Sequence, residues 1–204
     1  MTFILWIQFA LVCLLGAMSP GPSLALIINN SINYNRSSGI LASIAHGLGI
    51  FVYATITVVT LEFILQNNEA IFFIIQILGS IFLIFLGLVF IFKNNNEKNN
   101  ERNKINASSF AQGFIIAIIN PKILIWFVAI YSQFITINAN FSEKLILVIT
   151  PSIVDAIWYS LVAIMVTSFG LKDFFNNKKN TIQKIIGFLF IIIAFSLIFS
   201  LFNF

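Results

Sequence analysis

Six apolar stretches, each long enough to cross a lipid bilayer as an α-helix, dominate this chain of 204 residues. About 20 consecutive apolar residues span the hydrocarbon core of a membrane in helical form. The stretches are rich in phenylalanine and β-branched residues, but they lack the alternation of apolar and polar positions that is typical of strands. We therefore predict an all-α membrane protein with six transmembrane helices in a single domain, 1–204. The six stretches are 3–30, 39–65, 70–92, 108–133, 143–169 and 182–203.

The composition excludes a soluble fold. Only 9% of the residues are charged and 59% are hydrophobic, whereas soluble domains carry roughly 25% charged residues. The net charge of +4 does not indicate a nucleic-acid partner, because nearly all the basic residues lie in the loops between apolar stretches. The partner that this composition predicts is the lipid bilayer.

Basic residues in the predicted loops set the orientation of the chain. Nine lysines and arginines follow the first, third and fifth stretches, whereas the loops on the opposite side carry only Lys144. Loops rich in lysine and arginine stay in the cytoplasm. We therefore predict that these three loops are cytoplasmic and that both termini lie outside the cytoplasm.

A polar, asparagine-rich segment divides the chain into two halves. Residues 93–107 have no apolar face and are predicted to form a cytoplasmic linker. The halves, 1–92 and 108–204, each contain three predicted helices. An odd number of spans gives the halves opposite orientations, so we predict a 3+3 inverted repeat.

Proline interrupts the first and the fourth stretch at corresponding places, near the middle of each. A proline inside a helix removes a backbone donor and clashes with the preceding turn. In hydrocarbon, the freed carbonyl groups must face protein or a watery cavity. Paired interruptions of this kind indicate the binding site of a transporter, although a packing kink is the alternative. The two interruptions are Ser19-Pro20-Gly21-Pro22, followed by Ser23, and Asn120-Pro121-Lys122.

Each interruption can start a new half-helix near the centre of the membrane. Gly21 permits the bend, and Pro22 suits the first helical position. Asn120 is a favourable N-cap, with Pro121 in the first position of the following helix. The N–H groups and the positive dipole ends of both half-helices would then attract an anion such as a substrate carboxylate.

Lys122 and Asp155 are the two charges predicted to lie deepest in the membrane. A rise of about 1.5 Å per residue places them at similar depth. A charge at this depth should face the interior of the helix bundle. Asp155 could bind a substrate ammonium or carry a proton, and Lys122 could support a carboxylate. The alternative is a permanent ion pair between them that locks two helices together.

His46 lies in the second stretch and is a candidate proton relay, together with Asp155. Histidine exchanges protons readily near neutral pH, but a purely structural hydrogen bond within the bundle is the alternative. Trp126, Trp158 and Tyr159 are candidates for the lining of a cavity, or else they pack against lipid. Of these three, Trp158 is included in the predicted translocation site.

The motifs that would indicate an enzyme are absent from the sequence. It contains no GxGxxG, Walker or HExxH sequence. Cys13 is the only cysteine, so no disulfide or CxxC pair can form within the chain. We therefore predict a protein without enzymatic activity, cofactor or bound metal.

The order and spacing of these motifs resemble the lysine-exporter (LysE/RhtB-type) amino-acid efflux family. The resemblance covers nearly the whole chain except the asparagine-rich linker. It depends on Ser19-Pro20-Gly21-Pro22, Arg36, Gly39, Gly49, Gly79-Ser80, Leu86-Gly87, Phe110 to Gly113, Asn120-Pro121-Lys122, Gln133-Phe134, Asp155, Trp158 and Gly187.

The resemblance implies a six-span secondary transporter in the bacterial cytoplasmic (inner) membrane. Such a protein exports amino acids or related small molecules and is driven by the proton gradient. A homodimer is compatible with the resemblance. Ser23 departs from the family pattern, in which Asn or Asp often follows the Pro-Gly-Pro, and this difference bears on substrate choice. Related families suggest two alternatives, a divalent metal-ion exporter and a membrane redox protein. The lone Cys13 argues against the redox protein, and the few possible ligands argue against the metal exporter.

Overall fold

The computed structural model describes residues 1–92, 108–136, 139–169 and 171–202. Within these ranges the chain folds into eight α-helices and forms no strand. The predicted all-α fold is therefore confirmed, while the predicted linker at 93–107 lies outside the described residues. The helices are α1 (Phe3–Met18), α2 (Pro22–Asn33), α3 (Arg36–Asn67), α4 (Glu69–Phe92), α5 (Ser109–Ile119), α6 (Pro121–Phe134), α7 (Phe141–Ser168) and α8 (Lys172–Phe202).

Four of these helices are long and apolar enough to cross a membrane by themselves. They are α3, α4, α7 and the segment Asn180–Phe199 of α8. The short helices form two bent pairs, α1 with α2 and α5 with α6, whose axes turn by 62° and 57° respectively. By length and composition, the described part of the chain thus contains four candidate membrane spans, or up to six if each bent pair is one span.

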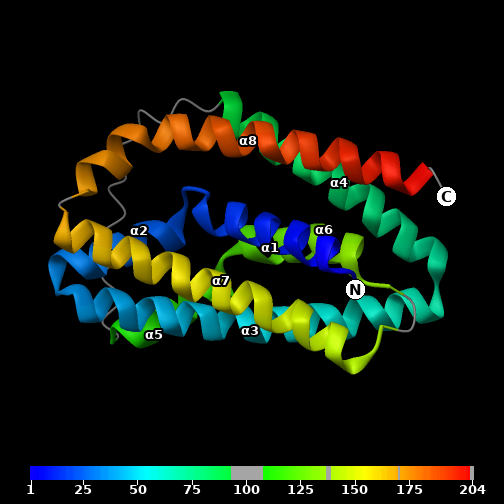
Figure 1. Cartoon of the computed structure of the whole chain (residues 1–204), viewed down its shortest axis with the longest axis horizontal. Coiled ribbons are helices and arrows are strands. Elements are labelled where there is room, and N and C mark those ends of the chain that lie inside the picture. Colours follow the sequence, from blue (N-terminus) through cyan, green and yellow to red (C-terminus); the bar gives the residue numbers. More distant parts are fainter. Residues whose placement is uncertain (93–107, 137–138, 170, 203–204) are drawn as a thin grey trace.

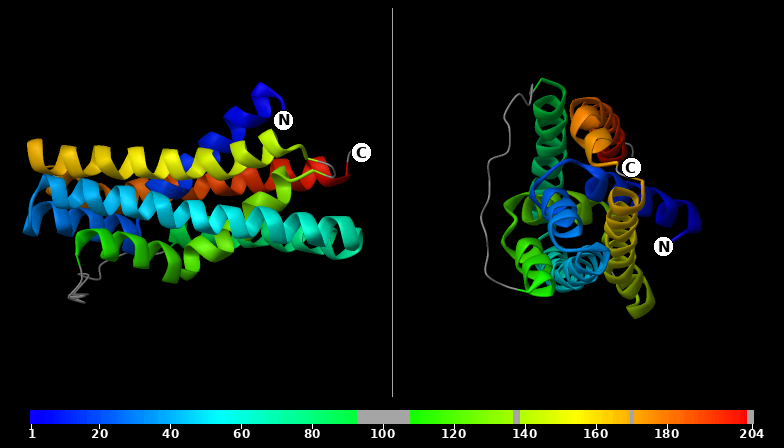
Figure 2. Two further views of the ribbon diagram at one scale, coloured as in Figure 1. Left: turned by 90° about the horizontal axis from the view of Figure 1, so that it is seen from below. Right: turned by 90° about the vertical axis from the view of Figure 1, so that its left-hand side faces the viewer.

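The long helices run roughly along the long axis of the molecule (Figure 1, Figure 2). α3 and α7 pack against each other on one side, and α4 and α8 pack against each other on the opposite side. α1 and α6 lie between these two pairs, whereas α2 and α5 pack against α3. This arrangement brings both helix bends to the inside of the bundle.

Two glycine contacts allow the helices to approach closely. A Cβ atom on Gly113 of α5 would overlap the backbone oxygen of Ala42 in α3. In the other helix pair, Gly87 of α4 faces Gly187 of α8, and a Cβ on either would lie 2.6 Å from the carbonyl oxygen of the other. Small residues at such crossings let the backbones pack directly against each other, as is common in membrane bundles.

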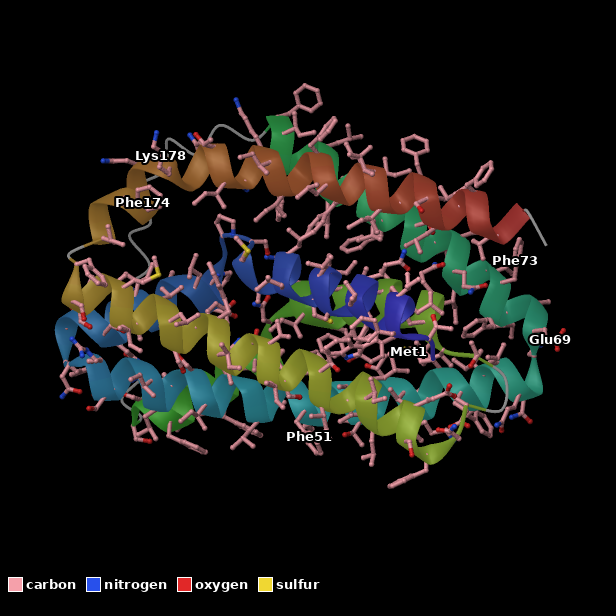
Figure 3. All side chains as sticks on the ribbon, in the orientation of Figure 1. Met1, Phe51, Glu69, Phe73, Phe174 and Lys178 are labelled. Atoms are coloured by element: carbon pink, nitrogen blue, oxygen red, sulfur yellow. The ribbon has the colours of Figure 1, made fainter. Side chains whose placement is uncertain are left out.

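The outer surface of the bundle is apolar. Phe51 of α3 and Phe73 of α4 point outward and are each 42% exposed (Figure 3). Large exposed apolar side chains occur on all four long helices, which fits a surface solvated by lipid tails rather than water. They include Val59, Phe63, Ile74, Phe85, Ile157, Phe188 and Phe195.

Polar contacts tie α3 to α7 at both ends of the bundle. At one end Arg36 donates hydrogen bonds to Thr167, over 3.1 Å, and to Ser168, over 2.6 Å. At the other end the Lys144 ammonium lies 2.5 Å from the Glu62 carboxylate. α3 and α7 are therefore held together by polar contacts at both of their ends.

Candidate functional site

A cavity of about 50 Å³ lies inside the bundle, where the two helix bends face the middle of α3 and α7. Its wall combines polar groups from the bends with aromatic groups from α6. The lining residues are Cys13, Gly16, Ala17, Ser19, Gly21, Ser23, His46, Ile50, Asn120, Lys122, Ile123, Trp126, Phe127, Tyr131, Pro151, Asp155 and Tyr159.

The first bend, between α1 and α2, supplies hydroxyl groups and helix ends. Ser19 caps the C-terminus of α1: its N–H donates to the carbonyls of Leu15 and Gly16, and its hydroxyl donates to Gly16 over 2.6 Å. Gly21 is the N-cap of α2, and Pro22 is the first helical residue. Proline is favourable in that position because its missing N–H would have no partner within the helix.

The second bend, between α5 and α6, turns on Asn120. This residue ends α5 and begins α6, and its side-chain oxygen accepts a hydrogen bond of 3.1 Å from the Lys122 N–H. Such a cap satisfies one of the N–H groups that the first helical turn leaves unpaired. Pro121 follows as the first residue of α6.

The side chain of Lys122 connects the two bends. Its ammonium donates to the Ser19 hydroxyl and, over 3.4 Å, to the Ser19 carbonyl oxygen at the end of α1. It also lies 5.4 Å from the centre of the Phe90 ring, in cation–π range. A Cβ on Gly21 would lie 3.6 Å from the ammonium, at ordinary van der Waals distance, so Gly21 lies directly beside the charge.

A continuous chain of buried hydrogen bonds crosses the other side of the cavity. His46 Nδ1 of α3 lies 2.5 Å from the Asp155 carboxylate of α7. The second ring nitrogen of His46 lies 2.8 Å from the hydroxyl of Ser23 in α2. The Asn120 amide donates to the same hydroxyl over 3.3 Å. These four side chains therefore link α7 and α3 to both helix bends, and all four residues are buried.

Lys122 and Asp155 both face the cavity but do not form an ion pair with each other. Among the ion pairs of the described residues, the partner of Asp155 is His46. The lysine instead contacts Ser19. The cavity thus carries a cation on one wall and an acid–histidine pair on another.

The aromatic candidates divide between the cavity and the packing around it. Trp126 and Tyr159 line the cavity, and the Tyr159 ring packs edge-on against the His46 ring with centroids 5.1 Å apart. Trp158 is not a lining residue and packs against a separate apolar cluster around Leu24 and Val162. Pro20 and Pro22 of the first bend are not among the lining residues either.

Several lining residues were not singled out from the sequence. Phe127 and Tyr131 of α6 line the cavity, as do Gly16 and Ala17 of α1. Residues three and four apart on a helix share one face, so counting back three residues from Ser19 would have found Gly16. Phe127 and Tyr131 are four residues apart and share a face with each other, but neither is three or four residues from Lys122, so the same count would have missed them.

The family model described as LysE type translocator matches residues 14–201 of the chain. The chain belongs to the LysE type translocator family. It is therefore a membrane translocator rather than an enzyme, and the resemblance drawn from its motifs is confirmed.

Curated relatives of this LysE-type protein cover most of its length. The uncharacterized membrane protein YrhP of Bacillus subtilis is 24% identical over 84% of the chain and 88% of the relative. The leucine efflux proteins of Salmonella choleraesuis and Salmonella typhimurium are each 20% identical, over 84% of both the chain and the relative. No solved structure is significantly similar to the chain.

Proposed function

We propose that this LysE-type protein is a secondary transporter that exports amino acids through the bacterial cytoplasmic membrane in exchange for protons. The observation that carries the proposal is the cavity between the helix bends, with Lys122 on one wall and the His46–Asp155 pair on another. Charged groups inside a membrane bundle are costly and mark transport pathways. The leucine efflux relatives support amino acids as the substrate class.

The two charged walls suit the two ends of a zwitterionic amino acid. The substrate carboxylate binds Lys122 in place of the Ser19 contacts, near the N-terminal turns of α2 and α6. Helix N-termini attract anions through their free N–H groups and dipoles. The substrate ammonium binds Asp155 across the cavity. An aliphatic or hydroxyl-bearing amino acid fits better than a cationic one, because Asp155 is the only carboxylate among the described residues that line the cavity.

Competition for Asp155 provides the coupling to protons. A carboxylate that has taken up a proton no longer attracts the substrate ammonium, so proton and substrate exclude each other from the site. His46 touches Asp155 directly and is able to pass the proton on. Mutually exclusive occupancy is the condition for antiport, in which inward proton movement drives outward transport of the amino acid.

The bent pairs supply the architecture for this cycle. In the proposal each pair is one broken span whose bend is caused by proline, which gives six spans and a 3+3 inverted repeat, with halves at 1–92 and 108–204. Broken helices that meet near the middle of the membrane build the binding sites of many transporters with inverted repeats. The similar turns of 62° and 57° in the two pairs support this relationship.

The arrangement of charges supports an orientation with both termini outside the cytoplasm. Lys178 of α8 lies toward one end of the long axis, whereas Glu69, at the start of α4, lies at the other end (Figure 3). The start of α1 and the end of α8 lie toward the Glu69 end (Figure 1). The end that carries Arg36 and Lys178 is then the cytoplasmic end.

An efflux panel tests the proposal. Cells that express the protein are loaded with dipeptides, and the export of each released amino acid is followed with and without a proton gradient. The proposal predicts faster export of at least one zwitterionic amino acid, with loss of this gain when the gradient is collapsed. Absence of added export across the panel would reject it. Unchanged metal resistance in the same cells would separate it from metal export.

A further inference from the structure

The cavity has two chemically different ends. The polar end, between the helix bends, holds the groups assigned above to the carboxylate and ammonium of the substrate. The other end is formed by large aromatic residues of α6 facing small residues of α1. The aromatic residues are Trp126, Phe127 and Tyr131, and the small ones are Cys13, Gly16 and Ala17.

The aromatic end begins one helical turn from the charge at the polar end. Trp126 follows Lys122 by four residues, which places it on the same face of α6 and about 6 Å further along the axis. This offset suits an amino acid whose carboxylate contacts Lys122 and whose side chain extends along α6. The side chain would then lie against Trp126.

The Trp126 ring has little freedom to move. A Cβ on Gly16 would lie only 2.8 Å from its Cε2 atom and 2.9 Å from its Cζ2 atom. On another side the ring packs against Phe190 of α8, with centroids 4.8 Å apart. The indole is therefore held between α1 and α8, and Gly16 is the residue that leaves room for it.

Among the described residues, the aromatic end carries no charged side chain that could pair with a charged substrate side chain. Phe127 stacks on Tyr131 with centroids 4.9 Å apart, and the Tyr131 hydroxyl already donates to the Leu147 carbonyl over 2.8 Å. A charge buried there without a partner would be costly. An uncharged, apolar side chain needs no such partner and would pack against the aromatic rings.

We propose that Trp126, positioned by Gly16, closes a pocket for the substrate side chain and so determines which apolar amino acids are exported. This inference deepens the proposed amino-acid export and depends on it. Gly16 acts as a positioning residue, because it shapes the pocket through Trp126. A smaller residue at 126 lengthens the pocket, whereas a side chain at 16 pushes the indole into it.

The test compares exported amino acids of graded size, alanine, leucine and phenylalanine, in cells that express each variant. One methylene group more or less in an apolar pocket changes selectivity by about tenfold or more. Trp126→Leu should therefore raise the export ratio of phenylalanine to leucine by about tenfold. Gly16→Ala should lower the ratio of leucine to alanine.

Trp158→Leu is the matched control, because Trp158 lies outside the cavity, and it should leave both ratios unchanged. Trp126→Phe keeps an aromatic ring against Phe190 and replaces Trp126→Leu if that variant does not reach the membrane. If the wild-type protein exports leucine but the Trp126 and Trp158 variants give equal export ratios, the proposed pocket is wrong while the proposed function stands. Wild-type protein that exports no amino acid would overturn both the pocket and the proposed function.

Discussion

His46 joins Asp155 through one ring nitrogen, over 2.5 Å, and reaches Ser23 through the other, over 2.8 Å. The imidazole thus stands between the buried acid of α7 and the first turn of α2. Its protonation decides whether the nitrogen facing Ser23 accepts or donates a hydrogen bond. A change in the protonation of the His46–Asp155 pair therefore alters the hydrogen bonding at the first helix bend and, through Ser23, at Asn120 in the second bend.

Replacement of His46 by glutamine should separate transport from proton coupling. Glutamine is able to bridge Asp155 and Ser23 by hydrogen bonds, but it does not carry a proton in the physiological range. We expect His46→Gln to retain exchange of labelled for unlabelled leucine across a proteoliposome membrane while losing export driven by a proton gradient. Equal loss or equal retention of both activities would contradict the relay.

Replacement of Lys122 should weaken substrate binding. A hydrogen bond to a charged group contributes about 1.5–3 kcal/mol, so Lys122→Met should reduce leucine export at low substrate concentration by about 10- to 100-fold. Lys184→Met is the matched control, since Lys184 is exposed on α8. Initial export rates in proteoliposomes measure both variants. Similar export rates for the two variants would show that Lys122 does not bind the substrate.

The sequence predicted the depth of the charged residues but not their partners. Residue counting placed Lys122 and Asp155 at similar depth, and both do face one cavity. Which groups touch depends on helix rotation and on long-range packing, which a residue count does not provide. The pairing of Asp155 with His46, 109 residues away in sequence, was therefore not predicted.

Hydropathy predicted the boundaries of some helices but not of others. The predicted stretch 70–92 agrees closely with α4, because apolar residues fill that helix. In contrast, α8 begins at Lys172 rather than at 182. Hydropathy marks the part of a helix that lies in hydrocarbon, whereas backbone hydrogen bonds continue the helix into polar sequence outside it.

Of the two neighbouring aromatic candidates on α7, Trp158 was predicted from the sequence to belong to the translocation site. Tyr159 lines the cavity, whereas Trp158 does not.

Close packing of α5 on α3 should make Gly113 intolerant of any side chain. Alanine there would collide with the backbone of Ala42, which cannot rotate away. Overpacking of this kind costs about 1–3 kcal/mol, so Gly113→Ala should lower the thermal unfolding temperature in detergent. Phe51→Ala removes a larger group from the lipid-facing surface and serves as the control. A smaller loss of stability for Gly113→Ala than for the control would contradict the contact.

The proposed orientation predicts the location of the C-terminus. Alkaline phosphatase becomes active only after export to the periplasm, whereas green fluorescent protein fluoresces only when it remains in the cytoplasm. A phosphatase fused after Phe204 should therefore be active, and green fluorescent protein fused at the same residue should be dark. Fusions within 93–107 should give the reverse result. Fluorescence from the C-terminal fusion would invert the orientation.

The most direct measurement of the transport site uses the carboxylate at its centre. Purified wild-type protein, Asp155→Asn and the control Glu69→Gln, whose acid is exposed at the start of α4, are reconstituted, and leucine movement driven by an imposed proton gradient is recorded. Wild-type protein and Glu69→Gln should transport leucine at similar rates, and Asp155→Asn should be inactive although folded. Wild-type rates from Asp155→Asn would contradict the account.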